Sequence, residues 1–174
     1  MEILKYTDER DLCYGLTGMA VSLFIYDSEQ YLDSLSLDAE AAEAFAVTPE
    51  FSAPVITSMS AKALWQHNLH QYEVTVGLAM SNLLCRALSG RGCQPEQEAV
   101  KAVHDFALEQ GHEMCALEDD EIEALYKKNY NYLAKVFGHH SVRSIIDDFV
   151  FRLQQRRTMS RDEVFDILRA LQML

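Results

Sequence analysis

The spacing of apolar residues constrains this chain more than any other feature, because they recur every three or four positions over most of its length. That interval places them on one face of an α-helix, whereas a half-buried strand alternates apolar and polar residues. The 174 residues also include only 3 Pro and 7 Gly, few turn formers for a protein built from many strands. We therefore expect an all-α fold.

Five segments carry helical spacing, and three of them also have start or stop signals. Ser160 and Glu163 form a capping box, Pro95 suits a first helical turn, and Gly111 and Gly138 suit helix ends. Asp119 is the expected N-cap of the helix that Gly138 ends. The longest segment has a heptad-like seam that favours a central position in a bundle. The segments are 60–88, with its seam at Trp65, Leu69, Tyr72, Val76, Ala79 and Leu83, and 95–111, 120–137, 141–156 and 160–174.

The N-terminal third is less regular. Residues 16–35 suit a helix, although Met19 to Tyr26 alone would also suit a short buried strand. Residues 38–46 are rich in helix formers, and 47–57 read as an extended connection. The prediction is one domain over residues 1–174, a single compact bundle of six to seven helices with one long central helix.

Composition indicates an ordered protein, with 49% hydrophobic and 24% charged residues. The four cysteines form no Cys-x-x-Cys pair, which favours reduced thiols in the cytoplasm. The first ten residues lack the basic-then-apolar order of a signal peptide. The apolar run from Met19 to Tyr26 is far shorter than the ~20 residues of a membrane helix. We expect a cytoplasmic protein with no membrane partner.

Charge is distributed unevenly. Residues 1–126 hold 6 basic and 22 acidic residues, whereas 127–169 hold 9 basic and 5 acidic, and the whole chain carries −12. Such polarity bears on partners rather than on fold. The basic cluster predicts contact with a protein partner or a second copy of the chain, although it could instead neutralise acidic helices of the same molecule. The net charge disfavours nucleic acid. The predicted partner-binding residues are Arg152, Arg156, Arg157 and Arg161.

Two groups of histidines have spacing that could suit a metal site. His67 and His70 share a helical face near Glu73, but no His-Glu-x-x-His pattern is present. Glu109 and His112 form one Glu-x-x-His, whereas a di-iron bundle needs this pair twice. Cys93, His112 and Cys115 would lack a fourth zinc ligand. His139-His140 suits an exposed turn between helices.

The dyad His104-Asp105, with an earlier histidine and a later aspartate, resembles the ligand order of the HD-type metal-dependent phosphohydrolases, which are also all-helical. The resemblance covers four isolated positions, and Lys101, four residues before Asp105, gives that carboxylate an ordinary ion pair. It implies a metal-dependent hydrolase with a His/Asp/Glu site. The positions are His70, His104, Asp105 and Asp147 or Asp148.

The sequence contains no nucleophile elbow and no glycine-rich phosphate loop after a strand; Ser89-Gly-Arg-Gly is short and follows a helix. We therefore expect no catalytic residues, metal or cofactor. The predicted function is that of a non-enzymatic helical interaction or regulatory protein, with the metal-dependent hydrolase as the alternative.

Overall fold

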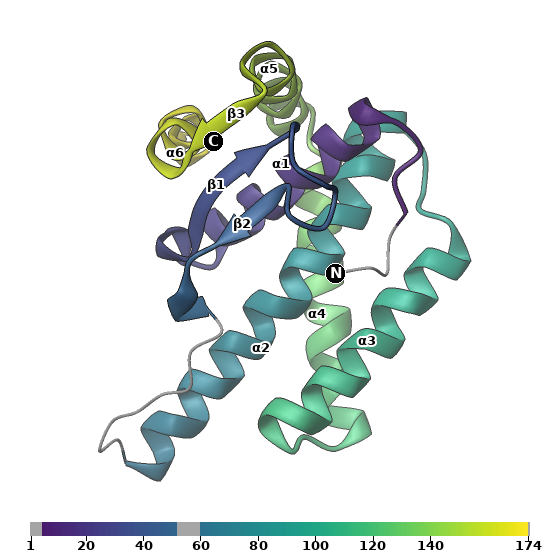
Figure 1. Cartoon of the computed structure of the whole chain (residues 1–174). Helices are drawn as coiled ribbons and strands as arrows, with labels where there is room; N and C mark the ends of the chain where they lie inside the picture. The colour runs from purple at the N-terminus through teal and green to yellow at the C-terminus, as the bar shows by residue number, and fades with distance from the viewer. Residues whose placement is uncertain (1–4, 52–59, 174) are drawn as a thin grey trace.

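The computed structural model describes residues 5–51 and 60–173, and this part of the chain forms six α-helices and a small three-stranded sheet (Figure 1). The helices are α1 (Glu9–Ile25), α2 (Ala61–Leu84), α3 (Gln97–Cys115), α4 (Asp119–Gly138), α5 (His140–Arg156) and α6 (Arg161–Leu168). The strands are β1 (Leu32–Ser36), β2 (Phe45–Val47) and β3 (Thr158–Ser160). The short helical turns are η1 (Glu29–Tyr31), η2 (Pro49–Phe51), η3 (Cys85–Arg91) and η4 (Arg169–Met173). The all-α bundle predicted from the sequence is confirmed.

Helix α1 lies at the centre of the molecule, between α2 and the sheet (Figure 1). Every residue from Cys13 to Leu23 is buried, as expected of a helix that is apolar all round. The segment that could have been a short strand is therefore the second half of α1. Gly18 allows α1 to touch α2, because a Cβ atom there would lie 2.3 Å from the backbone oxygen of Ser81.

Helix α2 is the predicted long central helix, but only its second half is in the core. Tyr72 and Leu83 of the predicted seam are buried, whereas Trp65 is 47% exposed. The first turns of α2 extend beyond the neighbouring elements (Figure 1). The prediction that Trp65 belongs to the inner face is therefore wrong, because no other described element covers this end of the helix.

Helices α3 and α4 form a hairpin that packs on α2. The helix predicted to end at Gly111 continues to Cys115, because Gly111 makes a close contact instead of a stop: a Cβ atom there would lie 2.6 Å from Ile122. Ala116, in left-handed conformation, is the actual C-cap. The N-cap of α4 is Glu118 rather than Asp119, in a capping box with Glu121.

The C-terminal helices agree closely with the prediction. Ser160 and Glu163 form the predicted capping box of α6, and hydrogen bonds from the backbone and hydroxyl of Ser160 lower the pKa of the Glu163 carboxyl. On α5, Arg152 donates to Asp148 at 2.9 Å, as expected of an i, i+4 pair. The last predicted helical residue, Leu174, lies outside the described residues.

The sheet is the element that sequence reasoning missed. Strand β1 pairs antiparallel with β2 on one side and with β3 on the other. Residues 38–44 form a turn rather than the expected helix, and Ser36 donates a backbone hydrogen bond to Ala44 at 2.9 Å. Pairing with β1 has overridden the local helix propensity. Of the predicted connection 47–57, residues 52–57 lie outside the described part. No described helix is long and apolar enough to cross a membrane.

Candidate functional site

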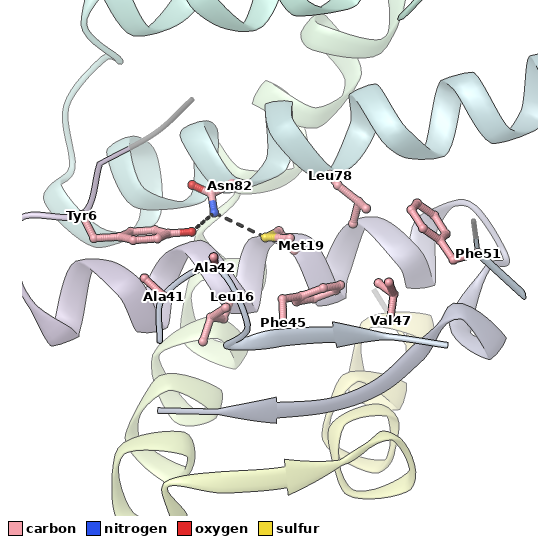
Figure 2. A pocket seen from close by; sticks show the side chains of 10 residues that line it. All are labelled: Tyr6, Leu16, Met19, Ala41, Ala42, Phe45, Val47, Phe51, Leu78 and Asn82. Atoms are coloured by element: carbon pink, nitrogen blue, oxygen red, sulfur yellow. Dashed lines mark hydrogen bonds between the residues drawn. The ribbon is translucent and has the colours of Figure 1, made fainter. Parts of the chain in front are cut away.

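An apolar pocket lies between α1, α2 and β2 (Figure 2). Its volume is about 230 Å³, and we call it the trough. Apolar pockets with a few fixed polar groups are the usual form of a binding site. The lining residues are Tyr6 at one end, Leu16 and Met19 from α1, Ala41 and Ala42 from the turn before β2, Phe45 and Val47 from β2, Leu78 and Asn82 from α2, and Phe51 at the other end.

The polar groups of the trough are gathered at the Tyr6 end. The Asn82 side-chain amide donates to the Tyr6 hydroxyl at 2.7 Å and to the sulfur of Met19 at 3.4 Å (Figure 2). Burial raises the pKa of the Tyr6 hydroxyl, so this group keeps its proton at neutral pH. Among the described residues no acceptor takes that proton, so the hydroxyl can donate to a group bound in the trough.

Tyr6 is held in place by a buried ion pair. Arg86, at the start of η3, binds Asp11 of α1 through two hydrogen bonds, from Nε at 2.8 Å and from Nη2 at 2.5 Å. Nη2 also donates to the backbone oxygen of Lys5 at 2.8 Å, and the guanidinium lies over the Tyr6 ring, 4.8 Å from its centroid. The segment before α1 is thereby fastened across one end of the trough.

The carboxyl group of Asp11 is ionised in this arrangement. Burial alone would raise its pKa, but hydrogen bonds from Arg86 and from the backbone of Thr7 outweigh burial and lower it. Both partners are almost fully buried, and bidentate arginine–carboxylate bonding is the geometry that compensates best for desolvation.

Strand β2 is an edge strand, because the sheet order is β2-β1-β3. Phe45 and Val47 lie two residues apart on one face of β2 and point toward Leu78 of α2 (Figure 2). The trough therefore follows the edge of the sheet. An edge strand next to apolar pockets is the arrangement with which proteins bind extended peptides.

The surroundings of the trough are acidic. Glu40 and Glu43 flank the lining residues Ala41 and Ala42, and Glu50 precedes the lining residue Phe51. All three carboxylates are exposed. Between Arg10 and Lys62 the sequence contains no basic residue, so no basic side chain from this segment compensates them.

The four arginines predicted to contact a partner lie around β3, and each has a carboxylate of the same chain nearby. Arg157 joins three segments, binding Glu9 and Asp38 at 2.8 Å each. The contacts of Arg157 are those that the alternative, neutralisation of acidic N-terminal residues within the molecule, predicts for one of the four arginines. A role in partner binding stays a prediction. The other pairs are Arg152–Asp148 at 2.9 Å, Arg156–Glu163 at 2.5 Å and Arg161–Asp162 at 3.7 Å.

The histidines do not converge. Among the described residues, no group of three or more His, Cys, Asp or Glu side chains is placed to hold a metal ion. His70 contacts Ser28 at 3.1 Å, and His104 contacts Glu123 at 2.6 Å. Asp105 pairs with Lys101, as expected. His112 contacts Asp119 at 2.8 Å.

The turn at His139-His140 is as predicted, between α4 and α5, and both side chains are exposed.

The sequence matches no known protein-family model and no curated protein.

Sequence reasoning missed the trough entirely. Its lining comes from the N-terminal segment, two helices, a turn and a strand, and no local pattern connects these positions. One signal was available. The stretch between Arg10 and Lys62 holds eight acidic residues and no basic one, and three of these acids, Glu40, Glu43 and Glu50, are sequence neighbours of lining residues.

Proposed function

We propose that this chain is a non-enzymatic interaction protein of the cytoplasm that binds an extended segment of a partner polypeptide in the trough. The observation that carries the proposal is the position of an apolar pocket along the edge of β2. A partner strand can add backbone hydrogen bonds to that edge while its alternate side chains enter the pocket.

The chemistry of the surroundings indicates what the partner segment carries. The apolar side chains of Leu16, Phe45 and Leu78 suit aliphatic or aromatic side chains, and the Tyr6 hydroxyl suits a carbonyl oxygen of the bound segment. Glu40, Glu43 and Glu50 favour a segment with lysine or arginine beside its apolar residues, because complementary charge steers and orients association.

A phage-displayed library of random short peptides, selected against the full chain, tests the proposal. We expect enrichment of sequences with alternating apolar residues flanked by Lys or Arg. A synthetic copy of the selected peptide should bind the wild type and lose at least tenfold in affinity with Ala42→Trp, which fills the trough from an exposed position.

The matched control is Ala170→Trp, an equal change at an exposed alanine beyond α6. Equal losses from both variants would contradict the proposal, and so would a selection that enriches nothing. If the wild type self-associates and Ala42→Trp does not, the segment bound in the trough would belong to a second copy of this chain rather than to a different protein.

A metal-dependent hydrolase is the alternative function. It has less support, because the described His, Cys, Asp and Glu residues are not grouped as ligands and because His70 and His104 bind different partners. Elemental analysis of protein purified without a metal-affinity tag separates the two functions. A stoichiometric transition metal would favour the hydrolase.

A further inference from the structure

A second pocket, of about 120 Å³, lies where the start of α1 meets the end of η3. Unlike the trough, it is lined by charged and polar groups. Its lining includes three arginines, Arg10 of α1 and Arg86 and Arg91 of η3, together with Tyr14 and two aspartates, Asp8 and Asp11. A fourth arginine, Arg143 of α5, lies next to Gly92, the residue that follows the lining residue Arg91, since a Cβ atom on Gly92 would be 3.7 Å from its guanidinium.

The carboxylates near this pocket are engaged within the chain. Asp11 is bound by Arg86, and Asp8 caps α1 by accepting a hydrogen bond from the Asp11 backbone at 2.8 Å. Asp147 of α5 accepts a hydrogen bond from the Tyr14 hydroxyl at 2.7 Å. Arg143 and Asp147, four residues apart on α5, form no ion pair within residues 5–51 and 60–173.

Three of the arginines, by contrast, form no short ion pair, although Asp8 and Asp11 line the same pocket. Within residues 5–51 and 60–173, Arg10 and Arg143 form no ion pair, and Arg91 reaches Glu96 only at 3.8 Å. Arg10 donates to the Tyr14 hydroxyl at a long 3.5 Å. Elsewhere in the chain, arginines such as Arg169 bind a carboxylate at 2.7 Å. Two arginines without a short ion pair, Arg10 and Arg91, thus line this one pocket in a protein of net charge −12.

Two glycines lie at this end of η3. Gly92 is the C-cap of η3 in left-handed conformation, with φ of 66°, a geometry that favours glycine. Gly90 lies against the Tyr14 ring, where a Cβ atom would be 3.0 Å from Cγ. The arginines therefore approach from three separate elements, α1, η3 and α5.

We propose that this pocket binds the phosphate group of a small phosphorylated molecule, between Arg10, Arg91 and Arg143. A single guanidinium satisfies the two coplanar oxygens of a carboxylate, whereas three guanidiniums from separate elements suit a tetrahedral group with several charged oxygens. Arg86 remains with Asp11 and forms the floor of the site. The site is separate from the trough and does not depend on its function.

Titration of the full chain with inorganic phosphate tests this site, by calorimetry and by the amide chemical shifts of Gly90 and Gly92. We expect saturable binding at an ionic strength held constant with sodium chloride, and weaker binding of acetate. Arg91→Gln should weaken phosphate binding at least tenfold. Arg10→Gln should do the same, which guards against a fold defect particular to one variant.

Arg169→Gln is the matched control, an exposed arginine removed far from the pocket in sequence, and it should leave phosphate binding unchanged. Three results would overturn the proposal: shifts that grow linearly without saturation, acetate binding as tight as phosphate, or equal binding by the wild type and Arg91→Gln.

Discussion

Arg86 and Asp11 form a two-bond ion pair that is almost fully buried, with exposed fractions of 5% and 8%. It joins the start of η3 to the first turn of α1 and holds Tyr6 at the end of the trough through the ring contact with Arg86. Replacing both partners of a buried ion pair with apolar residues changes the stability of a protein little. Removing only one partner is strongly destabilising, because the other charge is then left uncompensated in the interior.

We therefore predict that Asp11→Asn, which keeps the size of the side chain, destabilises the protein by about 3–5 kcal/mol. Urea unfolding at neutral pH measures the change. The matched control is Asp148→Asn, which removes the carboxylate of an exposed pair with Arg152 and should cost at most about 1 kcal/mol. Similar losses from the two variants would show that the buried pair has no special role.

The same pair predicts a pH dependence. The pKa of Asp11 is lower in the folded protein than in the unfolded chain, where it is ~3.9. As the pH falls, the Asp11 carboxyl therefore binds a proton in the unfolded chain before it does so in the folded protein. The ion pair contributes its full stabilisation above about pH 5, and this contribution is lost as the pH falls through ~3.9 toward the lower pKa of Asp11 in the folded protein. Unfolding free energies from pH 6 downward should fall more steeply for the wild type than for Asp11→Asn. Parallel curves would contradict this assignment.

Because α1 and α2 are in close contact at Gly18, adding a methyl group there should destabilise the protein, whereas adding one at Gly138 should not. Gly18→Ala would place its Cβ atom 2.3 Å from a backbone oxygen of α2, so the helices must separate, at a cost of about 1–3 kcal/mol or more. Gly138→Ala has nothing within 4 Å of the added atom and should be neutral or slightly stabilising. Thermal unfolding of the two variants checks the prediction, and equal melting temperatures would refute it.

The four thiols should differ in reactivity. Cys93 is exposed, whereas Cys13, Cys85 and Cys115 are buried, and burial raises the pKa of Cys13 to about 12. A thiol reagent at neutral pH should therefore modify one cysteine rapidly in the folded protein and all four after denaturation. Peptide mapping that finds early modification of Cys13 or Cys85 would contradict the described core.

Features that depend on neighbouring residues in the chain could be predicted from the sequence, whereas features that depend on contacts between distant segments could not. The capping box of Ser160 and Glu163 is local, and it is present as predicted. The end of α3 was misplaced because Gly111 is needed for contact with Ile122, a residue of the next helix. A turn and strand replaced the helix expected at 38–46 because β1 pairs with this segment. Such contacts between distant segments leave no periodic signal in the sequence.

The candidate site was less predictable than the fold for the same reason. The cluster of arginines around β3 is visible in the sequence. The carboxylates that pair with Arg157, Glu9 and Asp38, lie at distant positions and could not be identified from the sequence. The trough requires Tyr6, Phe45 and Asn82 to meet, and only the packing of α1 against α2 and the sheet brings them together.

Amide hydrogen exchange of the full chain, with and without the selected peptide, tests whether a partner segment adds to β2. We predict slower exchange of backbone amides in β2 (Phe45–Val47) when the peptide is bound, and no such protection with Ala42→Trp. Protection confined to the arginines around β3, or unchanged exchange in β2 despite binding, would contradict it.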